Sequence, residues 1–167
     1  GEFAYEPMEI VRDIGLGVSA TENVHTRQGG SDWAVSLDQL QDTLPNAARV
    51  SLFVSWFGTD LRAGQCQFMP AVDTADKSTS PLTWSVAGLA RAEARVVSQR
   101  DGRAAYGGTP SDASVVAAIE DLAARGLAVT LTPFPLMDIA ADNTLPDPYG
   151  AGAAQGERGG GEPAADD

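Results

Sequence analysis

Two aspartates, Asp60 and Asp138, are the residues of this sequence best suited to do chemistry. Each follows an apolar run that ends in aromatic residues, Trp56 in the first case and Phe134 in the second. Glycoside hydrolysis needs such a pair, because one acid protonates the leaving oxygen, the other acts as base or nucleophile, and aromatic faces stack on sugars. We therefore predict Asp60 and Asp138 as candidate catalytic residues. An aspartate after a strand also commonly forms a turn, and this structural interpretation stays open.

Three aromatic residues, Trp56, Trp84 and Tyr106, are the candidates for binding a substrate. Tryptophan is more often part of a core or its rim than a sugar platform, so packing is the alternative role. Tyr106 also opens the motif YGGTP, whose glycine pair before a helix could suit a phosphate. Because no GK[ST] motif and no GxGxxG after a strand accompany it, a tight turn is the favoured interpretation.

One cysteine and one histidine limit the metal and thiol chemistry. Cys66 alone cannot form an internal disulfide, and with His25 it cannot supply the four ligands of a structural zinc site. No strand-to-helix turn surrounds Cys66, which favours a buried or semi-buried thiol over a nucleophile. The sequence predicts no metal and no cofactor.

The charge balance and hydropathy exclude further classes. The chain has 23 acidic and 11 basic residues and a net charge of -12, which repels phosphate backbones and disfavours nucleic-acid binding. Such a surface also keeps a protein soluble. Because no run of about 18 apolar residues occurs, and no basic segment precedes a hydrophobic stretch at the start, we expect neither a membrane span nor an export signal.

Two helix-strand units must position the candidate residues. The first helix starts at Ser31 and ends before Pro45, and the apolar strand 49–57 follows. The second helix ends at Gly126, and strand 127–134 follows at once. Helix, tight turn, apolar strand and loop occur twice, a pattern that predicts β/α units on a parallel sheet.

The middle of the chain gives weaker signals. Residues 58–83 are rich in turn-forming types and predict a long loop, with 67–69 as its strand candidate. Within 94–106 the Asp101-Gly102 pair predicts a hairpin, although 89–94 alone would favour a helix.

We expect three parts along the chain. Residues 1–23 form a loose lead-in, and residues 24–150 form the folded domain. Residues 151–167 contain five glycines and no large apolar side chain, so burial cannot offset the entropy of ordering them. We expect a disordered tail there.

Four longer segments together are more specific than any single motif. They read GSDWAVSLDQL at 30–40, VSWFGTDLRAGQC at 54–66, AYGGTPSDASVV at 105–116 and DIAADNTLPDPYG at 138–150. In this order they resemble the glycoside-hydrolase TIM-barrel-like domain of the large, host-specificity tail protein of gene transfer agents and related tailed phages of alphaproteobacteria.

The resemblance implies an α/β fold, namely a partial (β/α) TIM-barrel-like fragment with a disordered C-terminal tail. A complete barrel needs eight strands over about 250 residues, so the chain is expected to be a piece of a larger protein. It also implies a tail-tip or baseplate component, made in the bacterial cytoplasm and carried in a phage-like particle. Its partners would be other tail or baseplate proteins and cell-surface glycans.

Three functional hypotheses remain. The first is a tail component whose parent barrel acts on or binds cell-envelope glycans. The second is a non-catalytic structural or adaptor module of the tail, and the third is an unrelated small β/α binding domain. Because the catalytic acids of such barrels generally lie on later strands, we expect this chain by itself to be inactive.

Overall fold

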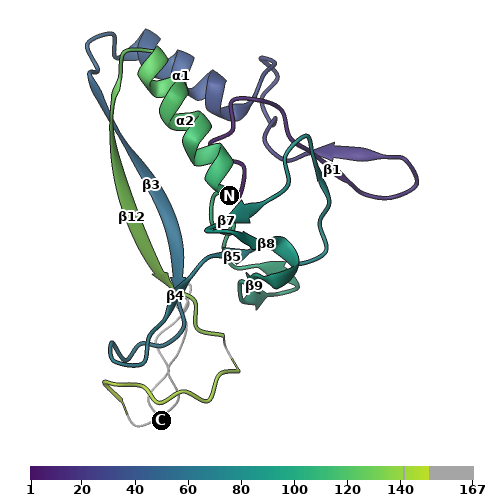
Figure 1. Ribbon diagram of the computed structural model, residues 1–167, viewed down its shortest axis with the longest axis vertical. Coiled ribbons are helices and arrows are strands. Elements are labelled where there is room, and N and C mark those ends of the chain that lie inside the picture. The colour runs from purple at the N-terminus through teal and green to yellow at the C-terminus, as the bar shows by residue number, and fades with distance from the viewer. Residues whose placement is uncertain (141, 151–167) are drawn as a thin grey trace, which may run out of the picture.

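The computed structural model describes residues 1–140 and 142–150 (Figure 1). The predicted disordered tail, 151–167, lies outside the described residues. Two helices and two strands are the longest elements, and most of the short strands lie to one side of them. The larger elements are α1 (Asp32–Thr43), β3 (Arg49–Gly58), α2 (Asp112–Ala124) and β12 (Ala128–Met137).

The two long strands form a parallel pair. Their register runs without interruption from Ala128 opposite Arg49 to Met137 opposite Gly58. Both helices cover one face of this pair, where Leu52 of β3 packs in a buried cluster with residues of the two helices. The remaining buried members of this cluster are Trp33, Leu37, Ala118, Leu122 and Leu127.

The helix boundaries agree with the sequence signals. Ser31 Oγ accepts a hydrogen bond from the Ala34 amide at 3.2 Å and caps α1. Helix α2 ends two residues before Gly126, whose φ of 78° lies in the left-handed region that glycine tolerates. There the Leu127 amide donates to the Leu122 carbonyl at 2.9 Å, a Schellman end that leads the chain directly into β12.

The remaining strands are two or three residues long and form small sheets. The parallel pair is joined by β4 (Phe68–Met69), which lies antiparallel to the end of β3. A second sheet has the order β2-β1-β6, and three further sheets have two strands each. Their bounds are β1 (Val11–Asp13), β2 (Ser19–Thr21), β5 (Ala71–Val72), β6 (Thr79–Ser80), β7 (Ser85–Val86), β8 (Leu89–Ala90), β9 (Arg95–Val96), β10 (Gln99–Arg100) and β11 (Arg103–Ala104).

The hairpin predicted at Asp101-Gly102 is confirmed, but its arms are only two residues long, and Arg95–Val96 pairs with β5 instead. Strands β10 and β11 pair antiparallel around Asp101 and Gly102, whose φ values of 52° and 72° suit a type I′ turn. The helical alternative over 89–94 is reduced to a single 3-10 turn, Arg91–Glu93. The predicted strand at 67–69 is β4.

The predicted partial (β/α) TIM barrel is wrong. The fold is mixed α/β, but among the described residues only β3 and β12 form a long parallel pair, and most other pairings are small and antiparallel. Between β3 and α2 the chain forms strands of two residues instead of another barrel strand. The repeated helix-strand pattern was correct for two units, but it does not specify a ring of such units.

Neither of the two helices that the structure describes is long and apolar enough to cross a membrane.

Leu122→Ala tests the helix layer, because Leu122 is fully buried between α2 and the strand pair. We expect the free energy of unfolding to fall by about 2 to 5 kcal/mol, through lost burial and the cavity that remains. Urea unfolding followed by circular dichroism measures it. The matched control is Val116→Ala on the same helix, 54% exposed, which should change stability by no more than about 0.5 kcal/mol. Equal effects of the two substitutions would contradict this packing.

Candidate functional site

The structure brings the loops that carry Asp60 and Asp138 to one end of the strand pair. The Asp138 amide donates to the carbonyl of Gly58 at 3.1 Å, and Asp60 lies two residues beyond that glycine. Both loops leave the lower end of the β3–β12 pair in Figure 1. The parallel arrangement of the two strands therefore makes this end the candidate site.

Asp60 is held as a carboxylate by Arg62. The guanidinium donates to both oxygens, from Nε at 3.0 Å and from Nη2 at 2.6 Å, and the Arg62 amide donates to Oδ1 at 2.9 Å. Hydrogen bonds from the Arg62 side chain, followed by that from its amide, lower the pKa of Asp60 below its ordinary value. The arrangement favours a turn-forming carboxylate that does not donate protons near neutral pH.

Asp138 is buried and connects β12 to the small sheets. It is 1% exposed, accepts hydrogen bonds from the amide and hydroxyl of Ser98, and forms an ion pair with Arg95 at 3.0 Å. The same guanidinium also donates to the Asp138 carbonyl. These contacts join residues 40 and 43 positions apart in the chain, so the carboxylate has a structural role.

The three candidate aromatic residues lie within or against hydrophobic clusters. Trp84 is 2% exposed, its indole donates to the Thr109 carbonyl at 2.8 Å, and Trp56 packs against the same cluster. Tyr106 packs on Phe57 with ring centroids 5.4 Å apart, and its hydroxyl donates to the Met137 carbonyl. The structure thus places these aromatic rings in hydrophobic packing and not on an open platform.

The glycine pair before α2 serves close packing. Gly108 has a φ of 77°, and a Cβ at this position would lie 2.9 Å from Cγ of Glu2 and 3.1 Å from the carbonyl of Ala71. The next residue, Thr109, is fully buried and exchanges hydrogen bonds with Ala71. The tight-turn interpretation therefore has a physical reason.

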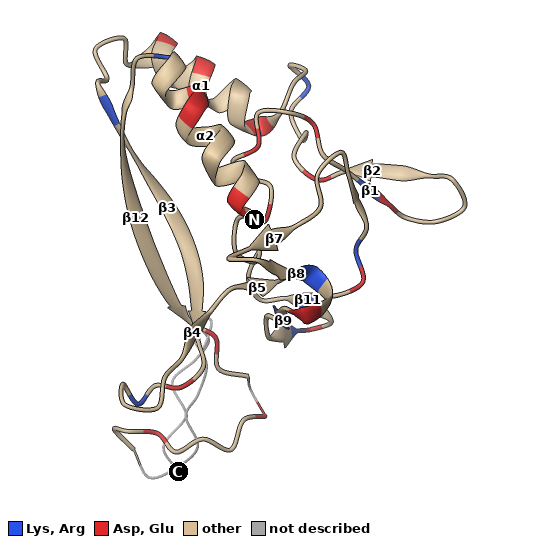
Figure 2. Ribbon diagram, in the orientation of Figure 1, with Lys and Arg blue, Asp and Glu red and all other residues tan. Residues whose placement is uncertain are grey.

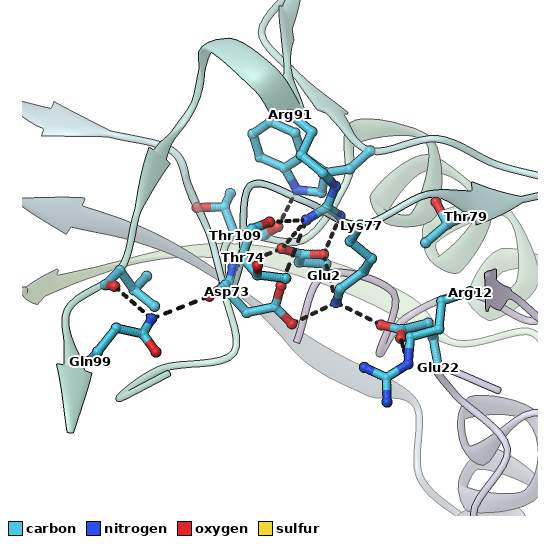
Figure 3. Close-up of polar contacts among 12 residues, drawn as sticks. Glu2, Arg12, Glu22, Asp73, Thr74, Lys77, Thr79, Arg91, Gln99 and Thr109 are labelled. Atoms are coloured by element: carbon cyan, nitrogen blue, oxygen red, sulfur yellow. Dashed lines mark hydrogen bonds and ion pairs between the residues drawn. The ribbon is translucent and has the colours of Figure 1, made fainter. Parts of the chain in front are cut away.

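The structure also contains a buried ionic cluster that was not predicted from the sequence (Figure 3). Its centre is Lys77, the chain's single lysine, whose side chain is 3% exposed. The ammonium contacts Asp73 at 2.6 Å, Glu22 at 2.8 Å and Glu2 at 3.4 Å. Burial by itself lowers the pKa of Lys77, but hydrogen bonds to Asp73 and Glu22 and the charge of Glu2 offset it and leave the pKa raised.

Arg91 completes this ionic cluster. Its guanidinium donates to both oxygens of Glu2 and, at 2.8 Å, to the Thr74 carbonyl, and it lies 6.0 Å from the centre of the Trp84 ring. On the other side Arg12 lies 3.4 Å from Glu22. The cluster therefore ties the N-terminal segment to the β1–β2 hairpin and to the loops after β5 and β8, and its charges neutralise one another.

A cavity of about 270 Å³ beside this cluster is lined by four carboxylates. Each of them has a cationic or ionisable partner in the protein. Glu2 and Asp73 face Arg91 and Lys77, Glu22 faces Lys77, and Asp32 contacts the imidazole of His25 at 2.6 Å. Among the residues that the structure describes, no group of three or more His, Cys, Asp and Glu is arranged to hold a metal ion.

Arg62→Gln tests the electrostatic role of Arg62. Because the folded-state pKa of Asp60 is lowered, the ion pair stabilises the fold above the ordinary carboxyl pKa, and this contribution is lost as the pH falls through the folded-state value. Without Arg62 we expect the pKa of Asp60 to rise toward 3.8, which a carboxyl-carbon NMR titration measures. Arg27→Gln, at an exposed site without an ion pair among the described residues, should leave it unchanged. An unchanged pKa in Arg62→Gln would contradict this role.

Lys77→Met tests the buried ionic cluster. Removing the ammonium leaves three carboxylates facing one another with too little positive charge, and we expect a loss of about 3 to 5 kcal/mol in the free energy of unfolding. The control is Arg103→Met, which removes an exposed cation and should have a small effect. As a second measurement, an amine-acylating reagent should modify Lys77 slowly in the folded chain and rapidly in urea. Rapid modification under native conditions would be inconsistent with the cluster.

Comparisons with known proteins do not place the chain in a family. No protein-family model matches it, and no curated protein matches it. The likeness to a tail protein therefore rests on the four sequence segments alone and stays a prediction.

Proposed function

We propose that this chain is a non-catalytic structural module of a phage-tail-like particle of the gene-transfer-agent type, where it contacts other tail or baseplate proteins. The particle assignment is supported by the four segments at 30–40, 54–66, 105–116 and 138–150. The non-catalytic role is supported by one observation, the pairing of both candidate carboxylates with arginines.

Glycosidic cleavage needs an acid that is protonated in the resting site, together with a second carboxylate that can reach the sugar. Asp60 has the opposite property, since Arg62 lowers its pKa and keeps it ionised. Asp138 is 1% exposed and would have to break its contacts with Ser98 and Arg95 to reach a substrate. The two side chains are better suited to holding loops in place than to transferring protons.

Glycan binding or cleavage is the competing proposal. It is favoured by the position of the two aspartates, which follow neighbouring parallel strands at the same end. It is disfavoured by the burial of Trp84 and Asp138, because neither side chain is available to an incoming sugar.

A release assay on peptidoglycan and on purified surface polysaccharide separates these two proposals. We expect the chain to release no reducing sugar above the buffer blank, with a glycoside hydrolase active on the same material as positive control. Measurable release that disappears in both Asp60→Asn and Asp138→Asn would overturn the non-catalytic proposal.

The particle assignment has its own test. Particles sedimented from a culture of the encoding bacterium should carry the chain, detected with an antibody raised against it. Its absence from sedimented particles, together with its presence in the cell extract, would refute that assignment.

A further inference from the structure

The outer edge of β12 has no strand beside it among the described residues. Strand β12 pairs with β3 over its whole length and with no other strand. The other edge of β3 is partly covered, because the Tyr5 hydroxyl donates to the Phe53 carbonyl at 2.6 Å and β4 pairs with Phe57 and Gly58. An uncovered edge of ten residues presents backbone groups that can template another strand.

The register shows which groups point outward. The Ala128 amide donates to the carbonyl of Ala48, the residue before β3, at 2.9 Å. The Asp138 amide donates to the carbonyl of Gly58 at 3.1 Å. Along a strand, the N–H and C=O groups of successive residues point to opposite sides. The backbone groups of the even-numbered residues of β12 therefore point toward β3, and those of the odd-numbered residues point outward. Pro133 and Pro135 therefore place their nitrogens on the open edge, where the missing N–H removes no bond to β3.

Two different halves of the edge result from this alternation. In the first half Val129 and Leu131 each present an amide and a carbonyl, as a pairing strand requires. In the second half Pro133 and Pro135 present carbonyls only. Neither half carries a charged side chain, since residues 128–137 contain none, and Figure 2 shows the strand without charged residues. Charged residues are a usual protection of open edges, so here only the proline half is protected.

The helix layer also stops short of this edge. Leu131 lies opposite Leu52 in the register and on the same face of the pair, yet Leu131 is 52% exposed and Leu52 is 2% exposed. Val116 and Ile119 of α2 are 54% and 36% exposed. At 3.6 residues per turn they lie away from Asp121, which contacts Trp33 of α1. Their apolar surface is thus on the side of α2 that α1 leaves uncovered.

The opposite face of the strand pair is apolar as well. Phe53 and Phe134 stack edge to face with ring centroids 6.0 Å apart, and they are 50% and 48% exposed. A strand added beside β12 would have apolar surface available on both of its faces, from Leu131 on one side and from Phe134 on the other.

We propose that the open edge of β12 receives an extended, basic segment of another protein, which hydrogen-bonds to the backbone of Val129 and Leu131. This is strand addition, in which main-chain bonds give affinity and alternate side chains give specificity. A second copy is disfavoured as the occupant, because each chain carries a net charge of -12. Beyond Leu131 the carbonyls of Pro133 and Pro135 can accept from lysine, arginine or asparagine side chains of the segment.

The inference does not depend on the proposed function, because it rests on the strand geometry. Its test uses the whole chain and, as the probe, a heptapeptide of alternating valine and threonine with lysine at both ends. Amide hydrogen exchange is followed by NMR. Without peptide, Val129 and Leu131 should exchange fast while Thr130 and Thr132 are protected, and saturating peptide should protect Val129 and Leu131 as well.

Leu131→Pro supplies the matched variant. The new proline nitrogen points outward, as those of Pro133 and Pro135 do. The hydrogen bonds between β12 and β3 are therefore kept, while one outward N–H donor is lost. We expect peptide binding to weaken about fivefold, the value of one hydrogen bond. Leu131→Ala keeps the N–H at position 131. In the peptide complex this N–H should stay protected from hydrogen exchange. The urea midpoint of each variant shows whether the fold is intact.

Four outcomes would overturn the inference. They are the absence of peptide binding, equal binding by a fully folded Leu131→Pro, protection of Val129 and Leu131 in the free chain at all concentrations, and protection that grows with concentration. The third outcome would mean that the chain covers its own edge. The fourth would identify a second copy as the occupant.

Discussion

The parallel pairing of β3 with β12 is the constraint on which the rest of the structure depends. Parallel neighbours cannot be joined by a tight turn, so the chain must return from the end of β3 to the start of β12. Helix α2 makes the last part of that return, and the Schellman end at Gly126 delivers the chain to Ala128 in register with Arg49. The same pairing fixes the far end, where the Asp138 amide meets Gly58.

The segment between β3 and α2 contains no long helix or strand, so other contacts must hold it in place. Between β3 and α2 the strands are only two residues long, and such short pairings contribute little by themselves. Two ionic groups supply long-range ties there, Asp138 with Arg95 and Glu2 with Arg91. Buried ion pairs add little net stability relative to apolar packing, but each becomes costly when one partner is removed. These ion pairs therefore favour this arrangement of the loops over arrangements that would separate the paired charges.

The long elements could be predicted from the sequence, whereas the short strands and their ionic contacts could not. The two helices, β3, β12 and the Asp101-Gly102 hairpin were predicted because their caps, turns and periodicity are local signals. The partial barrel that the resemblance implies was wrong, because the pairing of further strands with β3 and β12 depends on contacts that local patterns do not contain. The two-residue strands are too short for a period, and a buried lysine such as Lys77 has no local signature that distinguishes it from a surface one.

The candidate site shows the same limit. The parallel-strand argument brought the loops of Asp60 and Asp138 to one end, but it could not give their partners. Arg62 is only two residues from Asp60 and could have been considered, whereas Arg95 lies 43 positions from Asp138. A proline pair in β12 likewise carried no meaning until the register was known. Once it is known that the even-numbered residues face β3, both prolines must lie on the open edge, which limits strand addition to the half of β12 that they leave unprotected.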